Sequence, residues 1–386
     1  MMNDMRYDIT VPGIPDAPRL VRWLEENGVP AGRDLSGIEL FSGGKSNLTY
    51  RLRVAPGSGG AGDLPGSGGA GDPPGSGGAA SSRGDGDLVL RRPPLGHVLP
   101  TAHDMGREYG VISALHGTGV PVPEPIAHCT DPDVIGAPFY VMRYVPGLVL
   151  RTDKDAGEIT RAEAREISER LIDTLAAIHQ VDVAEVGLDG FGRPDGYLAR
   201  QLKRWQRQWE LSVTRELPSF DRLVTRLAER LPPDDPARPA ILVHGDFRLD
   251  NVLLQTSPQV RVNAVVDWEM STLGDPLADL GLTLTYWADA GDAERLAIKL
   301  PGDVTARPGF LSSHEVADRY ARMTGHDIAG IGYYMAFGCF KLAVVSEGIH
   351  ARFLQHKTVG EGFEQTGESV PILIERAHRL LDQIGS

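Results

Sequence analysis

The chain has 386 residues, enough for two domains or one large bilobed domain, and 41% of them are hydrophobic and 24% charged, an ordinary composition for a soluble globular protein. Its formal net charge is −13, which argues against general nucleic-acid binding or retention on an anionic membrane. Cys129 and Cys339 have no metal-ligand spacing and are typical of buried thiols in a reducing compartment. Residues 1–10 lack the apolar core of a signal peptide, and the apolar stretch 333–345 is too short to span a membrane. We therefore predict a cytoplasmic protein.

The first 54 residues predict a helix and two strands. Residues 17–27 carry apolar side chains at helical spacing, and Gly28 follows them. Residues 38–41 form a short apolar run, and residues 48–54 alternate apolar and polar side chains as a half-buried strand does.

The connection between these two strands is Gly-rich and reads Ser42-Gly43-Gly44-Lys45-Ser46-Asn47. Such a hairpin tip lets backbone N–H groups approach a phosphate, and Ser46 or Asn47 could add a side-chain donor; a plain turn is the alternative interpretation. A P-loop is excluded, because that motif needs a glycine where the chain has Glu39.

A Gly-rich repeat then interrupts the sheet. Residues 57–65 recur almost unchanged as residues 66–74, and their first five residues recur again from Gly75. Three such copies with prolines cannot stack a core. We predict that residues 55–87 are a disordered insertion, which is tolerable because loop-closure cost grows slowly with length.

The sheet resumes at residues 88–91, and residues 102–116 predict a helix that carries Glu108. Residues 139–142 predict a strand that runs into a linker at residues 144–147. From Thr160, which forms a capping box with Glu163, the chain becomes helical.

A helix after residue 200 has two chemically different faces. Leu202, Trp205 and Trp209 share one face. The other face carries basic side chains, namely Arg200, Lys203, Arg204 and Arg207. This basic face is either solvated or grips an anionic acceptor.

The strongest chemical signal lies in residues 241–254. An apolar run leads into His244-Gly245-Asp246, a second apolar run follows Asn251, and a strand-like run at residues 262–266 delivers Asp267. His-x-Asp-x-x-x-x-Asn has the spacing of the kinase catalytic loop. One acid plus an amide–acid pair on neighbouring strand ends suits phosphoryl transfer, in which a carboxylate orients the attacking hydroxyl and oxygen ligands hold Mg²⁺. A simple turn at His-Gly-Asp is the structural alternative.

A further helix is predicted to begin at Pro276, with Asp275 as its N-cap. We interpret Asp275 and Asp279 as braces of the catalytic loop that do not touch substrate. Residues 313–384 are predicted to be mostly helical, and their histidines show no metal spacing.

These segments together resemble the aminoglycoside phosphotransferase family, in particular a branch that is fused to acyl-CoA dehydrogenases in animals. The segments that carry the resemblance are 43–47, 90–94, 244–251, 266–269 and 273–280. The resemblance implies an α+β, bilobed, protein-kinase-like fold. The nucleotide-binding lobe, residues 1–145, would have an antiparallel sheet plus a helix, and the catalytic and substrate lobe, residues 146–386, would be larger and mostly helical.

The resemblance also implies a role for each matched residue. Asp246 would be the catalytic acid beside the acceptor hydroxyl, and Asn251 and Asp267 would hold Mg²⁺. The remaining implied residues would bind ATP or GTP: Gly43, Gly44, Ser46 and Asn47 over the phosphates, Arg91 paired with Glu108, Met142 in the adenine pocket, and the backbone from Arg143 to Val145 at the adenine edge.

Arg91 departs from the kinase pattern, which has lysine at this strand position. Arginine keeps the charge and can form a bidentate pair with Glu108, but it is longer and planar. Arg92 is the alternative if the strand register is shifted by one residue.

The sequence thus predicts a phosphotransferase that uses ATP or GTP and Mg²⁺ and acts on a hydroxyl of a small molecule. The basic face beside two tryptophans favours a hydroxyacyl-CoA-like acceptor over an aminoglycoside, because a polycation suits an acidic cleft. A nucleotide-binding, pseudokinase-like regulator without catalysis is the alternative that Arg91 suggests.

Overall fold

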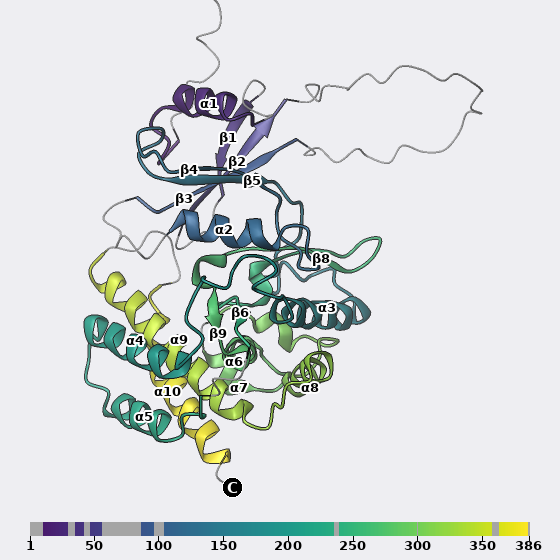
Figure 1. The fold of residues 1–386 in the computed structure, drawn as a ribbon. Coiled ribbons are helices and arrows are strands. Elements are labelled where there is room, and N and C mark those ends of the chain that lie inside the picture. The colour runs from purple at the N-terminus through teal and green to yellow at the C-terminus, as the bar shows by residue number, and fades with distance from the viewer. Residues whose placement is uncertain are drawn as a thin grey trace, which may run out of the picture. The chain divides into compact units, whose positions relative to one another are not determined.

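The structure is a computed structural model that describes residues 11–29, 35–41, 47–55, 86–95, 104–234, 239–298, 300–356 and 363–384. The chain folds into two compact units, drawn in Figure 1. The first comprises Met1–Ser113 and Pro123–Pro146, and the second comprises Ala114–Val122 and Gly147–Ser386.

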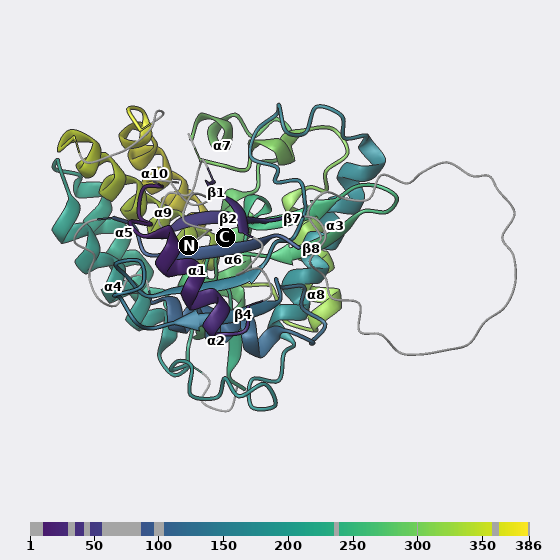
Figure 2. The ribbon, with the colours of Figure 1, turned by 90° about the horizontal axis from the view of Figure 1, so that it is seen from above.

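The first unit is built on a five-stranded antiparallel sheet with the strand order β1-β2-β3-β5-β4. Its strands are β1 (Leu35–Leu40), β2 (Leu48–Val54), β3 (Leu88–Arg92), β4 (Pro125–Cys129) and β5 (Phe139–Arg143). Helix α1 (Ala17–Glu26) lies over one face of the sheet, and α2 (Met105–Leu115) lies along the other face (Figures 1 and 2). The two helices thereby cover both faces.

The core of the first unit follows from the two side-chain periodicities. Leu20 and Leu24 are four residues apart on α1, and Tyr50 and Leu52 are two residues apart on β2, so each pair points to one side. These four side chains are fully buried and belong to one hydrophobic cluster. The same period of two turns the neighbouring Arg91 and Arg92 of β3 to opposite faces of the sheet.

The second unit is mostly helical. Its helices are α3 (Arg161–His179), α4 (Tyr197–Ser212), α5 (Pro218–Glu229), α6 (Pro276–Tyr286), α7 (Ala293–Ala297), α8 (Ser313–Thr324), α9 (Ile331–Leu354) and α10 (Thr366–Gln383). Two short antiparallel pairs accompany them, β6 (Ile241–Val243) with β9 (Thr272–Gly274) and β7 (Val252–Gln255) with β8 (Arg261–Val265).

Helix α9 packs against α10, α6 and α4, which explains why the apolar stretch 333–345 is a buried helix. Helices α3 and α8 lie side by side (Figure 2), where Arg319 forms an ion pair with Asp173 at 2.7 Å. Within the described ranges, none of the helices combines the length and the apolar content that crossing a bilayer requires.

Most predicted elements are confirmed. Helix α3 begins with the expected capping box between Thr160 and Glu163, and α6 begins at Pro276 after its N-cap Asp275. Cys129 and Cys339 are free and buried, as predicted.

Some elements differ from the prediction. Strand β1 begins at Leu35, and α2 spans Met105–Leu115, shorter than residues 102–116. Strand β4 and helix α5 were not anticipated. Strand β4 is an edge strand in which only Cys129 is buried, so it lacks the alternation that would reveal it. The predicted disorder falls on residues that, apart from 55, 86 and 87, lie outside the described ranges.

Candidate active site

The catalytic loop begins where β6 ends, next to its partner strand β9. Its second residue, Gly245, has φ of +82°, and a Cβ at this position would lie 2.5 Å from the carbonyl oxygen of Met270. Both the left-handed backbone and the close approach therefore require glycine. The tight turn at Gly245 sets the direction in which Asp246 leaves the strand.

Asp246 lies at the centre of a group of polar side chains. The amide Nδ2 of Asn251 donates to the backbone oxygen of Asp246 at 2.8 Å and to its Oδ2 at 3.3 Å. The hydroxyl of Tyr286, at the end of α6, donates to Oδ1 at 3.3 Å. Arg248 Nε lies 3.3 Å from Oδ2. The carboxylate is thus oriented from three sides, while about a fifth of the side chain stays exposed (22%).

Asn251 and Asp267 lie at adjacent strand ends. The β7–β8 pairing matches Val252 with Val265, and the N–H of Val266 donates to the carbonyl oxygen of Asn251 at 2.9 Å. Asp267 follows in a left-handed conformation with φ of +70°. The hairpin therefore places the two predicted residues at neighbouring strand ends.

Carboxamide and carboxylate oxygens suit Mg²⁺, which takes one or two carboxylates and completes its shell with phosphates and water. Within the described ranges, no group of three or more His, Cys, Asp or Glu residues could hold an ion. Asn251 and Asp267 therefore fit a metal that a nucleotide brings with it better than a metal enclosed by protein ligands alone.

A buried carboxylate braces the loop from behind. Asp279, which is 2% exposed, accepts hydrogen bonds from the backbone N–H groups of His244 at 2.6 Å and Gly245 at 2.9 Å, and its Oδ2 lies 3.3 Å from His179 Nε2. Burial would raise the pKa of Asp279, but the hydrogen bond and charge of His179, aided by His244, hold it below its ordinary value. The expectation that Asp279 braces the loop is confirmed.

His244 is a neutral part of this brace. Burial lowers its pKa against the opposing pull of Asp279, Asp246 and Asp267. Its Nε2 lies 3.1 Å from the carbonyl oxygen of Val266, and its Nδ1 accepts from the N–H of Asp246 at 3.3 Å. One donor and one acceptor are what a neutral imidazole offers, so His244 links the loop to the residue that follows β8.

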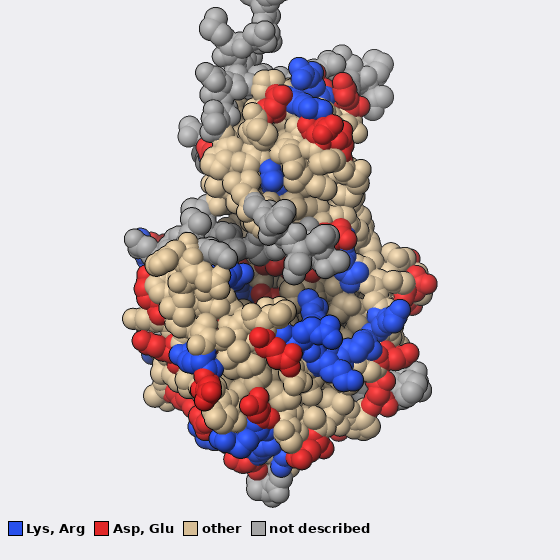
Figure 3. Space-filling model, turned by 90° about the vertical axis from the view of Figure 1, so that its left-hand side faces the viewer, with Lys and Arg blue, Asp and Glu red and all other residues tan. Residues whose placement is uncertain are grey.

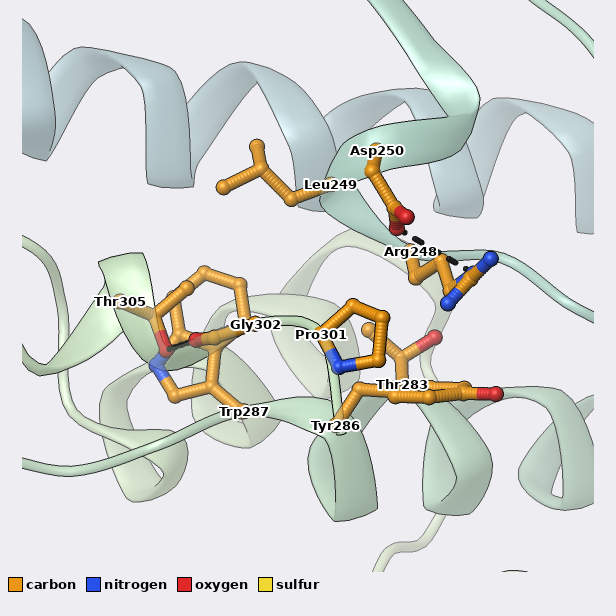
Figure 4. A pocket seen from close by; sticks show the side chains of 9 residues that line it. All are labelled: Arg248, Leu249, Asp250, Thr283, Tyr286, Trp287, Pro301, Gly302 and Thr305. Carbon is orange, nitrogen blue, oxygen red and sulfur yellow. Dashed lines mark hydrogen bonds and ion pairs between the residues drawn. The ribbon is translucent and has the colours of Figure 1, made fainter. Parts of the chain in front are cut away.

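A small pocket, drawn in Figure 4, is lined by Arg248 and Tyr286, which both contact Asp246. Arg248 bridges Asp246 and Asp250, and its guanidinium lies 5.0 Å from the centre of the Tyr286 ring. Burial, together with Asp246, raises the pKa of Asp250 against the pull of Arg248. Sequence reasoning gave no role to Arg248 or Tyr286. Arg248 lay inside the motif, whereas nothing local marked Tyr286, forty residues from Asp246.

The two predicted faces of helix α4 are confirmed, although the helix begins at Tyr197, earlier than predicted. Trp205 and Trp209 are buried, and Trp209 stacks on Phe220 with ring centroids 3.8 Å apart. The ammonium of Lys341, on α9, lies 5.4 Å from the centre of the Trp205 ring. The predicted basic side chains are exposed, and Figure 3 shows Lys and Arg side chains gathered on the side of the molecule where α4 lies.

In the first unit, Arg91 and Glu108 form the expected ion pair, with Arg91 Nε 3.1 Å from Glu108 Oε2 and both side chains nearly buried. Arg92 instead turns to the other face, where it donates to the carbonyl oxygens of Gly13 and Ile135. The strand register therefore gives the lysine-like position to Arg91.

The other predicted nucleotide contacts are partly described. Gly43, Gly44 and Ser46 lie outside the described residues, whereas Asn47 is buried at the start of β2. Met142 is buried in β5.

The backbone after β5 offers fewer donors than its sequence suggests. The N–H of Arg143 donates to Glu124 and that of Tyr144 donates to Asp87. Among the described residues, Val145 therefore supplies the free N–H of these three.

The chain is similar in sequence to a known protein family and to several characterised proteins. The model of the phosphotransferase enzyme family matches residues 37–304. Acyl-CoA dehydrogenase family member 11 of Gallus gallus is 38% identical over 299 residues, which are 76% of this chain but 37% of that relative. The chain thus spans little more than a third of this curated relative's length.

The fold of the chain is also similar to the folds of solved phosphotransferase structures. A candidate aminoglycoside phosphotransferase from Ralstonia eutropha superposes with a TM-score of 0.72 at 30% identity, over 95% of this chain and 98% of that chain. Aminoglycoside phosphotransferase APH(4)-Ia in a ternary complex with AMP-PNP and hygromycin B superposes with a TM-score of 0.55 at 14% identity, over 95% and 98%. The predicted α+β, protein-kinase-like fold is confirmed.

Proposed function

The chain belongs to the phosphotransferase enzyme family, and from this premise we propose that it moves the γ-phosphoryl group of ATP or GTP to a hydroxyl of a small molecule. The observation that carries the proposal is the placement of Asp246 within hydrogen-bond distance of Asn251, whose strand end adjoins that of Asp267. These are the groups that orient a hydroxyl and hold a nucleotide-bound metal.

In the proposed reaction, the acceptor hydroxyl oxygen forms a bond to the γ-phosphorus as the bond from that phosphorus to the β,γ-bridging oxygen breaks. The hydroxyl proton passes to the carboxylate of Asp246, and the nucleoside diphosphate leaves. Tyr286 and Asn251 hold that carboxylate in place. Asn251 and Asp267 would hold Mg²⁺, which neutralises charge on the phosphates when bound.

We assign nucleotide binding to residues 1–145 and the acceptor to residues 146–386. Arg91, fixed by Glu108, offers a buried cation for the phosphates. Residues 43–47 would cover the phosphates, Met142 would form an apolar wall for the base, and the N–H of Val145 would donate to its edge. The AMP-PNP in the APH(4)-Ia complex supports a nucleotide substrate in this fold.

For the acceptor, we propose a hydroxyacyl-CoA-like molecule in preference to an aminoglycoside. The exposed basic side chains of α4 suit an anion, and the buried Trp205 gives the helix an aromatic anchor. The similarity to acyl-CoA dehydrogenase family member 11 supports acyl-CoA chemistry.

The catalytic assignment is tested with Asp246→Asn, which removes the carboxylate but keeps the size of the side chain. We expect turnover to fall by at least about 10²-fold, the lower end of what a positioned base contributes, with nucleotide affinity within a few-fold of the parent. Turnover at the parent rate would make the assignment wrong.

The acceptor assignment is tested by measuring nucleotide consumption with a 4-hydroxyacyl-CoA and with a kanamycin-type aminoglycoside, side by side. Activity on the aminoglycoside alone would overturn the hydroxyacyl-CoA proposal. Nucleotide binding without turnover on any acceptor would favour a pseudokinase-like regulator, to which the Arg91–Glu108 pair is equally suited.

A further inference from the structure

One lysine beside the catalytic loop has no role in the function proposed above. Lys341 Nζ donates to the carbonyl oxygen of Gly245 at 2.5 Å, one residue before Asp246. An ammonium has three donors, and this is the one hydrogen bond that Lys341 forms among the described residues, where it has no ion pair. The side chain is partly exposed, so two donors remain for a ligand.

The charge of Lys341 is not neutralised by direct contact. Both oxygens of Asp279 already accept backbone N–H groups, and those of Asp246 accept from Asn251 and Tyr286. Burial lowers the pKa of Lys341, while the charges of Asp246 and Asp279 oppose that shift.

The surroundings of Lys341 favour an anionic or strongly polarised oxygen. The ring face of Trp205 lies 5.4 Å from Nζ and forms a flat, nearly buried wall. An oxygen bound to the ammonium would stand close to Asp246, and an apolar carbon chain joining that oxygen to the reacting hydroxyl could lie against the tryptophan.

We propose that Lys341 is a specificity-determining residue of the acceptor site. Its ammonium binds a carboxylate or carbonyl oxygen of the acceptor whose hydroxyl lies at Asp246, and it repels an ammonium group in the same place. This inference rests on the proposed phosphotransfer. It adds a residue that selects acceptors by the charge of the group near the reacting hydroxyl, which the basic face of α4 does not specify.

The test compares three acceptors that share one five-carbon chain with the hydroxyl at the same place: 4-hydroxypentanoate, its coenzyme A thioester and 5-aminopentan-2-ol. The variants are Lys341→Met, which removes the charge, Lys341→Arg, which keeps it, and Lys154→Met, a control on an exposed lysine. The readout is the ratio of kcat/KM for an oxygen-bearing acceptor to kcat/KM for the amine, which does not depend on the fraction of folded enzyme.

We expect Lys341→Met to lower this ratio roughly 10- to 100-fold, the range for losing a hydrogen bond to a charged group, mainly through the KM of the oxygen-bearing acceptor. Lys341→Arg should retain most of the preference, and Lys154→Met should equal the parent. A loss confined to the thioester identifies its carbonyl as the ligand, and a loss confined to the free acid identifies the carboxylate.

An equal fall for the oxygen-bearing acceptors and the amine would show that Lys341 only supports the Gly245 carbonyl, and would overturn the proposal. If the parent enzyme phosphorylates none of the three, the proposed function fails for these acceptors, and calorimetric binding of the acid and the thioester decides on Lys341. Weaker binding to Lys341→Met than to the parent supports the role, whereas equal binding or none overturns it.

Discussion

The two sides of the catalytic loop differ in how deeply their polar groups are buried. We call the side of Asp279 and His179 the rear, and the side of Asp246 and Arg248 the front. On the rear, Asp279 is 2% exposed and accepts hydrogen bonds from two backbone N–H groups, and His179 Nε2 lies 3.3 Å from its Oδ2. On the front, the side chains of Asp246 and Arg248 keep 22% and 20% of their surface exposed. The rear therefore holds the shape of the loop, while the front keeps groups that a ligand can reach.

Because of this difference, we expect substitutions on the two sides of the loop to affect different properties, namely stability on the rear and activity on the front. A substitution on the rear should cost folding free energy, because it leaves buried donors without an acceptor. A substitution on the front should lower turnover, because the proposed function has these groups act on substrate, and should cost less stability because they are partly exposed.

The largest expected effect is that of Asp279→Asn on stability. One carboxylate oxygen becomes an NH₂ group that faces the N–H of His244 or of Gly245 donor to donor, and the charge is lost. We therefore expect the free energy of unfolding to fall by about 3–5 kcal/mol, as for a broken buried charge pair. Urea denaturation measures it, with Asp246→Asn as the front-side control. An equal loss in that control would break the comparison.

The pH dependence of this effect has a definite sign. The pKa of Asp279 is depressed in the folded chain, so its contribution is fully present above the unfolded value of about 3.9 and is lost as the pH falls through the folded value. The stability gap between the parent and Asp279→Asn should therefore be constant near neutral pH and should narrow below about pH 4.

A smaller loss is expected from Gly245→Ala. The added Cβ meets both a left-handed backbone and the Met270 carbonyl oxygen at 2.5 Å. Gly117→Ala is the matched control, since Gly117 has φ of +85° but no atom within 4 Å of a Cβ. We expect about 1–2 kcal/mol for the control, which carries the strain alone, and more for Gly245→Ala. Equal losses in thermal unfolding would show that the contact with Met270 relaxes.

The sequence predicted residues that lie close together in the chain better than contacts between distant elements. Asp246, Asn251 and Asp267 lie within 22 residues on one loop and one hairpin, so their chemistry and spacing are visible in the chain. The capping box at Thr160 was equally accessible from its local spacing, whereas the Arg91–Glu108 pair was implied by the family resemblance.

What the sequence could not supply are contacts between elements far apart in the chain. His179 reaches Asp279 across 100 residues, and Lys341 reaches Gly245 across 96. No periodicity marks either side chain, since a histidine or a lysine on a helix is ordinarily a satisfied or solvated residue. Their positions depend on how α3, α6 and α9 pack, which only the folded structure contains.

Two tyrosines, one on each side of the loop, allow the front and the rear to be compared through the loss of a single hydroxyl group. Tyr286→Phe removes the front-side donor to Asp246 at 3.3 Å, and Tyr320→Phe removes the rear-side hydroxyl that lies 2.7 Å from His179 Nδ1. Burial and Asp246 raise the pKa of Tyr286, so its hydroxyl stays protonated and its loss should not change the pH profile.

For each tyrosine we expect an effect of about 1 kcal/mol, the net value of one hydrogen bond. For Tyr286→Phe it should appear as a several-fold lower kcat with little change in melting temperature. For Tyr320→Phe it should appear as lower stability with kcat unchanged. Steady-state kinetics and thermal unfolding are measured on the same samples. A loss of stability in Tyr286→Phe together with a loss of kcat in Tyr320→Phe would contradict the division into front and rear.

The smallest effect is expected on the exposed face of α4, whose sequence fits either a solvated face or an acceptor grip. Lys203 and Arg207 are exposed, and neither has an ion pair within the described part of the chain. Charges of this kind are screened beyond about 8 Å at physiological salt, so Lys203→Gln with Arg207→Gln should raise the acceptor KM only about two- to fivefold. The increase should vanish at high salt because it reflects long-range attraction, unlike the contact proposed for Lys341. A large increase that persists in salt would instead place these side chains directly on the acceptor.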